Sequence, residues 1–207
     1  RLHAGAHSHA HADRSPAGSV GRGGLTVFTK ALKVAVLTLL AYLLQATAAE
    51  YLSIADVAPN LALAIIAIAT VALGRKYTFV MALAVGYLIE IMTPMLDYIS
   101  LILYPVAAML SALVFSDKSE RKLEEERTLG RRTNQWNPHL RTPLCAALSV
   151  TVFEAVHLLY TYLSGVSLDG GHWRRALIDV LYSTFLAGVL QFPVRWWLGV
   201  YKLKKAR

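Results

Sequence analysis

Among the ionisable side chains within the long apolar stretches of this chain or next to their ends, five are the candidates for chemistry. They are Glu90, Glu154, His157, Arg175 and Asp179. Placing a charged side chain away from water costs free energy, so a charge in an apolar segment often marks a functional site. Carboxylates and imidazoles also bind metals and transfer protons, which makes these residues the chain's candidates for chemistry.

Metal binding and catalysis both need more groups than the sequence brings together. Glu154 and His157 have a metal-ligand spacing on a helix, but one pair supplies only two ligands and no second pair occurs. The sequence has no HExxH motif, Gly-rich phosphate loop or Ser–His–Asp set. We therefore predict a protein that is not an enzyme and has no metal or cofactor. A His-rich start could bind a divalent metal, but its composition favours a floppy tail (His3, His7, His9, His11).

Six apolar runs must position these residues. About 20 apolar residues in a helix cross a bilayer core of roughly 30 Å. Four runs reach that length, and the second and third are shorter and joined by a tight turn at Gly74-Arg75-Lys76. The sequence therefore predicts an all-α, polytopic membrane protein with a six-helix transmembrane bundle. The runs are 29–48, 60–73, 77–92, 98–115, 143–164 and 176–201, with the second entering from about Val57.

The basic residues predict the orientation of this bundle. With both termini in the cytoplasm, all but two of the 21 Lys and Arg residues fall on the inner side, and only Arg174 and Arg175 lie outside. The formal net charge of +8 is thus a topology signal. It does not indicate nucleic acid, because the basic residues adjoin helix ends rather than alternating with base-stacking aromatics. The lipid bilayer is the expected surrounding.

The domain organisation follows from these runs. Residues 1–24 are expected to form a disordered tail rich in His, Gly and Ala. Residues 25–201 are expected to form the transmembrane domain, with a charged cytoplasmic loop at 116–142. Residues 202–207 are expected to be a basic cytoplasmic tail. The single Cys145 excludes a disulfide within the chain.

In this orientation, polar residues gather toward the outer side. We call them the outer polar cluster: Asn60, Gly86, Glu90, Glu154, His157, Arg175 and Asp179. Gly86 and Glu90 share a helix face, and Arg175 and Asp179 have the same spacing and can form an ion pair. One interpretation is that the outer arginines or lipid headgroups satisfy these carboxylates. The alternative is a pocket or a partner-docking surface.

The second apolar run, LALAIIAIATVALG, is rich in Ala. Small side chains let membrane helices approach closely, and close van der Waals contact drives their association in lipid. We therefore expect a single-span partner to dock on the side of this helix that carries Ala62, Ala69 and Ala72.

Several of these features together resemble the rod shape-determining MreD family. They are the Pro59-Asn60-Leu61 helix start, the basic turn at Gly74-Arg75-Lys76, and Gly86 followed four residues later by Glu90. Gln45 before Tyr51-Leu52 and Pro193 in the last run also fit, so the likeness covers about 25–201. The family usually has Asp at the position of Glu90, and the loop at 116–142 is longer than the resemblance leads one to expect.

The resemblance implies a non-enzymatic scaffold in the bacterial cytoplasmic (inner) membrane. Such proteins associate with the single-span protein MreC, and through it link the actin-like MreB filament to the peptidoglycan synthase RodA and its transpeptidase partner. The resemblance also implies a bundle similar to the substrate-binding subunits of energy-coupling-factor transporters.

That similarity supplies the alternative function, a vitamin- or metabolite-binding membrane subunit. In those subunits an Ala-x-x-x-Ala motif of the first helix docks the coupling module, and this chain has Ala31 and Ala35 at the corresponding end. Pairs of small residues at this spacing also recur by chance in membrane helices.

Overall fold

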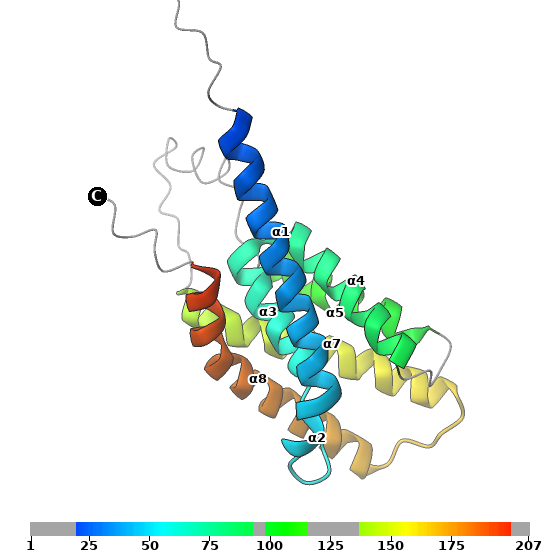
Figure 1. Ribbon diagram of the computed structural model, residues 1–207. Helices are drawn as coiled ribbons and strands as arrows, with labels where there is room; N and C mark the ends of the chain where they lie inside the picture. Colours follow the sequence, from blue (N-terminus) through cyan, green and yellow to red (C-terminus); the bar gives the residue numbers. More distant parts are fainter. Residues whose placement is uncertain (1–19, 93–97, 116–136, 200–207) are drawn as a thin grey trace, which may run out of the picture. The chain divides into compact units, whose positions relative to one another are not determined.

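The structure is a computed structural model that describes residues 20–92, 98–115 and 137–199 (Figure 1). Within these ranges the regular structure is helical, apart from an isolated bridge between Ile54 and Val57. The prediction of an all-α fold is confirmed for these residues. The elements are α1 (Val20–Leu43), a π-helical turn (Leu44–Ala48), α2 (Ala49–Tyr51), α3 (Leu61–Leu73), α4 (Arg75–Met92), α5 (Ile99–Phe115), α7 (Pro138–Leu163) and α8 (Gly170–Leu198).

The chain divides into two compact units, residues 1–32 and residues 33–207. In the first unit the structure describes the start of α1, from Val20 onward. Residues 20–24 are therefore helical, whereas composition assigned them to the disordered tail. The four His residues of that tail, and most of the predicted 116–142 loop, lie outside the described residues.

A helix occupies each of the six predicted apolar runs, but several helices begin elsewhere than expected. The second begins at Leu61 rather than near Val57, because Asn60 caps it. The last two begin early, at Pro138 and Gly170, because Asn137 and Asp169 accept hydrogen bonds from first-turn N–H groups. These short polar capping residues decide where the helices begin. The length of an apolar run does not reveal such caps.

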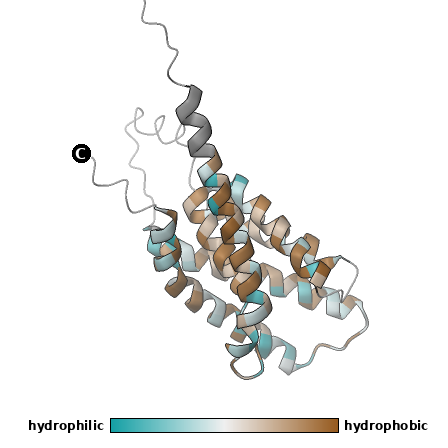
Figure 2. Ribbon diagram, in the orientation of Figure 1, coloured by the Kyte–Doolittle hydropathy of each residue, from teal (hydrophilic) through white to brown (hydrophobic). Residues whose placement is uncertain are grey.

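Three of the described segments are long and apolar enough to cross a membrane: Phe28–Tyr51, His139–Leu163 and Gly170–Leu198. The helices Leu61–Leu73 and Ile99–Phe115 are apolar but shorter. Figure 2 shows hydrophobic residues along the helices, with hydrophilic residues gathered mainly toward their ends. This composition is that of an α-helical membrane protein.

In α8 several polar side chains are buried and large apolar side chains are exposed, which is the reverse of a surface helix in a water-soluble protein. Its buried side includes Asp179, Ser183, Gln191 and Arg195. Its exposed side carries an apolar stripe at helical spacing: Trp173, Leu177, Leu181, Phe185, Val189, Phe192 and Trp196. An apolar exterior over a partly polar interior suits contact with lipid, because lipid does not penalise exposed apolar side chains.

Helix α3 is the buried core of the bundle, packing against α4, α5, α7 and α8. Ten consecutive residues from Leu61 to Thr70 are buried. Ala62 and Ala69 have no exposed surface, while Ala72 is partly exposed. The predicted docking face is therefore wrong for Ala62 and Ala69, because their small side chains admit neighbouring helices of the same chain.

Helices α4 and α5 lie close together at Gly86. A Cβ atom placed there would lie 2.7 Å from the Ser100 carbonyl oxygen and 3.3 Å from the Leu101 Cα. One turn further on, the Oε2 atom of Glu90 accepts a hydrogen bond from the Ser100 N–H at 3.0 Å. Gly86 thus makes room for the start of α5, and Glu90 accepts one of its free N–H groups.

We expect Gly86→Ala to destabilise the bundle by about 1–3 kcal/mol, because the added methyl group meets backbone atoms that cannot rotate away. Gly188→Ala is the matched control, since a Cβ there meets nothing within 4 Å. Its higher helix propensity should leave stability unchanged or raise it by up to about 1 kcal/mol. Thermal unfolding in detergent measures both; equal midpoints for the two variants would contradict the packing.

Candidate functional site

The site is built around the first turn of α3, whose N–H groups are satisfied by side chains from elsewhere in the chain. The Asn60 N–H donates to the Asp179 Oδ1 at 3.0 Å and to the Ser183 Oγ at 2.8 Å. The Ala62 N–H donates to the Gln45 Oε1, and the Leu63 N–H to the Asn60 Oδ1, both at 3.0 Å. Free first-turn N–H groups are costly where water is absent, and here each has an acceptor.

Gln45 reaches α3 from the π-helical turn Leu44–Ala48. A π turn inserts an extra residue into the helix and changes the direction of the side chains that it carries. The Gln45 side chain binds the Ala62 N–H through Oε1 and lies 3.5 Å from the Pro59 carbonyl oxygen through Nε2. The Gln45 side chain thus contacts the N-terminal end of α3 through both its amide N–H group and its amide oxygen.

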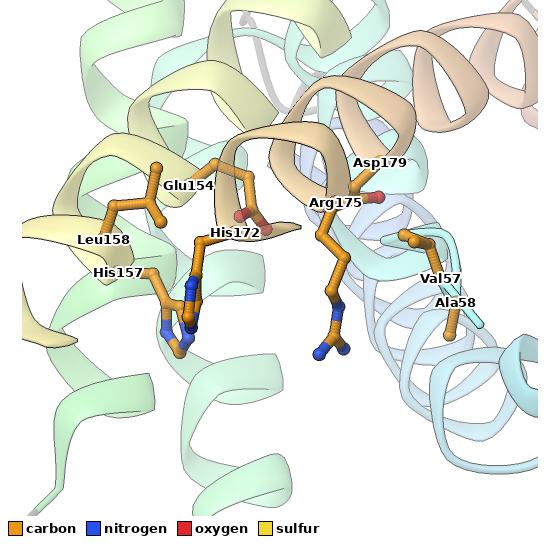
Figure 3. Close-up of a pocket in the computed structure, with 8 residues that line it drawn as sticks. All are labelled: Val57, Ala58, Glu154, His157, Leu158, His172, Arg175 and Asp179. Carbon is orange, nitrogen blue, oxygen red and sulfur yellow. The ribbon is translucent and has the colours of Figure 1, made fainter. Parts of the chain in front are cut away.

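Asp179 is anchored differently from the sequence-based expectation. Its carboxylate, with only 6% of the residue exposed, accepts from Asn60 and from the Ser183 hydroxyl at 2.7 Å. Among the described residues no ion pair joins it to Arg175, and the Arg175 side chain extends away from it in Figure 3. The predicted Arg175–Asp179 pair is therefore wrong, because the N-terminus of α3 offers this carboxylate closer donors.

The predicted outer polar cluster divides into two groups. Gly86 and Glu90 belong to the contact between α4 and α5. Asn60 and Asp179 lie at the start of α3, and Glu154, His157 and Arg175 join Asp179 around a pocket. Helical spacing paired Gly86 with Glu90 correctly, but it could not indicate that their neighbour is α5.

The pocket has a volume of about 190 Å³ and receives residues from three segments (Figure 3). Val57 and Ala58 come from the loop before α3. Helix α7 and helix α8 supply the rest: Glu154, His157, Leu158, His172, Arg175 and Asp179. Two carboxylates, one guanidinium and two imidazoles therefore share one small space with three apolar side chains.

A tight turn presents Val57 and Ala58 to this pocket. The backbone N–H groups of Ile54 and Val57 donate to each other's carbonyl oxygens at 3.0 Å. The two residues between them, Ala55 and Asp56, have φ values of 54° and 61°. This is the geometry of a two-residue hairpin turn, and it reverses the chain shortly before the start of α3.

His172 is fixed by its own helix cap. Asp169 accepts from the His172 backbone N–H at 3.1 Å, and the His172 Nδ1 lies 2.6 Å from the Asp169 Oδ1. The hydrogen bond from the His172 side chain, and then that from its backbone, hold the pKa of the Asp169 carboxyl below its ordinary value. This reciprocal cap orients the imidazole at the rim of the pocket.

A row of aromatic rings, which we call the aromatic ladder, begins at His157 in the lining of the pocket. The ring of His157 is parallel to that of Phe153, with 6.4 Å between centroids. Phe153 meets Tyr104 of α5 edge to face at 5.1 Å. Tyr104 is buried, and its hydroxyl lies near the Asn60 side chain. The ladder therefore connects the pocket to the start of α3.

Sequence reasoning missed His172, Ser183 and the turn residues Val57 and Ala58. The Asp169-Gly-Gly-His172 spacing is a recognisable capping pattern and could have placed His172 at the start of a helix. Ser183 gives no such signal, since a Ser in an apolar helix is common. Within the described ranges, no group of three or more His, Cys, Asp or Glu residues is arranged to hold a metal ion.

Comparison of the chain with family models, with curated proteins and with solved structures finds no match.

We expect Asp179→Leu to destabilise the protein by about 1–3 kcal/mol, because it removes an acceptor from a buried N–H group and a buried hydroxyl. Asp179→Asn keeps a carbonyl acceptor and should cost less. Thermal unfolding of the purified variants in detergent tests this order, with the exposed Glu50→Leu as control. Wild-type stability of Asp179→Leu would show that this carboxylate does not anchor α3.

Proposed function

We propose that this chain is a non-enzymatic scaffold of the bacterial cell-elongation machinery, in the cytoplasmic membrane, that docks an MreC-like single-span protein. Through that partner it would connect indirectly with MreB, RodA and the transpeptidase partner of RodA. The bundle would have six spans, with both termini in the cytoplasm.

The observation that carries this proposal is the role of the residues on which the MreD resemblance rests. Asn60 caps α3, and Gln45 binds the same helix end. Gly74, at φ 87°, turns the chain from α3 into α4, and Gly86 and Glu90 set the approach of α5. Each of these residues supports the packing of the helices, as expected in a scaffold that works by presenting a stable surface to its partners.

The basic residues of the predicted inner side support the same orientation. Arg75 donates to the carbonyl oxygens of Ala112 and Leu113 at 3.3 and 3.2 Å, and Arg141 donates to that of Phe115. Lys33 donates to the Trp197 and Leu198 carbonyl oxygens at 3.4 and 3.3 Å. These cations bind the C-terminal ends of α5 and α8, where the helix dipole favours positive charge.

The six-span arrangement predicts opposite accessibility for two exposed positions, Lys76 before the body of α4 and Ser167 between α7 and α8. A cysteine at Ser167 should react with a membrane-impermeant maleimide in intact spheroplasts. A cysteine at Lys76 should react only after permeabilisation. The natural Cys145 is fully buried and should give little background. Labelling in the reverse pattern would contradict the orientation.

Docking should use an exposed face rather than α3. Photo-crosslinking residues at the exposed Leu83, Leu110 and Leu181 sample α4, α5 and α8, and the fully buried Ala69 is the matched control. We expect an MreC-like protein to co-purify and to crosslink from at least one exposed face but not from Ala69. Depletion of the chain should round rod-shaped cells. Normal shape after depletion, with no shape protein crosslinked, would refute the scaffold.

The pocket favours one other candidate, a membrane subunit that binds a metabolite for an energy-coupling-factor transporter. It brings convergent polar groups into a concave site, as small-molecule sites do. Co-purification of an ATPase pair and a bound metabolite, in place of shape proteins, would select this alternative.

A further inference from the structure

Glu154 lies beside a second carboxyl group, that of Asp179, in the lining of the pocket. It lies within α7, only partly exposed, and its side chain is a hydrogen-bond neighbour of the Asp179 carboxyl group. Its nearest charged neighbours are the Asp179 carboxylate and Arg175. Two carboxylates close together away from bulk water repel each other, so a cation that binds both is favoured.

Asp179 is held rigidly in the same pocket lining. Its Oδ1 accepts from Asn60 and Ser183, and the same carboxyl group is a hydrogen-bond neighbour of Glu154. The residue is 6% exposed and lines the pocket. A buried, rigidly held carboxylate oxygen beside Glu154 is a preformed acceptor for a donor that enters the pocket.

The residues around the two carboxyl groups favour an ammonium group over a metal ion as the bound cation. The His, Cys, Asp and Glu groups described here are not arranged as a metal site. An ammonium group, in contrast, has three N–H donors that two carboxylates can share. Leu158, Val57 and Ala58 provide apolar contact for a short carbon skeleton next to such a group.

Arg175 supplies the opposite charge within the same pocket. Its side chain is exposed and extends away from Asp179 (Figure 3). The guanidinium offers a planar pair of donors that matches a carboxylate. The volume of about 190 Å³ is below the usual range of drug-sized sites, roughly 300–1,000 Å³, and therefore suits a ligand of few heavy atoms.

We propose that this pocket binds a small amino-acid-like zwitterion, with its ammonium group between Glu154 and Asp179 and its carboxylate at Arg175. The site goes beyond the scaffold function and does not depend on it, because a scaffold and a transporter subunit could each carry a ligand. His172, held by Asp169, and His157, stacked on Phe153, form the rim.

The test is calorimetric titration of the purified full chain in detergent with glycine, L-alanine and L-leucine. Propionate, which lacks the ammonium group, and ethylamine, which lacks the carboxylate, are the probes for each half. At least one amino acid should bind 10-fold or more tightly than both half-ligands, and should raise the midpoint of thermal unfolding.

Variants of the protein test the contacts to the ammonium group and to the carboxylate of the ligand separately. Glu154→Gln should weaken amino-acid binding at least 10-fold without loss of the fold, since Gln keeps the size of the side chain and its amide can still hydrogen-bond to Asp179. Arg175→Gln should weaken it similarly. The matched controls, Arg174→Gln next to the pocket and Glu50→Gln outside it, should bind as the wild type does.

Three results would overturn the proposal. They are no binding of any of the three amino acids by the folded protein, ethylamine binding as tightly as the best amino acid, and propionate doing so. The second would make the pocket a simple cation site and the third an anion site. Because the titration needs no partner, its failure is distinguishable from a failure of the scaffold, which crosslinking and cell shape report.

Discussion

The N–H groups in the first turn of α3 cannot donate hydrogen bonds to water, because the helix is buried along almost its whole length. The contacts that hold α8 and the π turn against the start of α3 meet this constraint. Asp179 and Ser183 of α8 satisfy the Asn60 N–H, Gln45 of the π turn satisfies Ala62, and Asn60 satisfies Leu63. These bonds fix α8 and the end of the first helix against α3. A carboxylate at this position also matches the positive end of the α3 dipole.

The opposite end of α3 obeys the same requirement with different groups. Gly74 takes a positive φ, and its N–H donates to the Thr70 carbonyl oxygen at 3.1 Å. The hydroxyls of Thr78 and Thr70 then meet at 3.0 Å across the turn into α4. Between α5 and α7, Ser111 and Ser149 form a similar contact at 2.6 Å. Hydroxyl pairs and alanines let these helices lie close together with their polar groups paired.

The pocket is a consequence of how α3 is anchored. Asp179 acts as a hydrogen-bond acceptor beside α3, and this places its side chain within reach of Glu154. The hairpin turn at Ala55-Asp56 covers the start of α3 and so contributes the pocket's apolar wall. Stability and binding therefore share residues on the α8 side, while Glu154, Arg175 and His157 lie in the pocket without supporting α3. Changes at the first group should affect fold and binding together, and changes at the second should affect binding alone.

The sequence by itself determined the helical class, the approximate span of each described apolar helix but not where several of them begin, the shared face of Gly86 and Glu90, and the polar residues worth examining. Run length, apolar content and helical spacing are local properties, and the chain carries them whatever its neighbours are. Only the tertiary structure decided that Asp179 meets Asn60 rather than Arg175, that Glu90 serves α5, and that Ala62 and Ala69 face other helices of the chain. The spacing of residues gives the face of a helix, but the element packed against that face depends on contacts between distant segments. In this bundle those contacts were selected by the buried N–H and carbonyl groups that had to be paired.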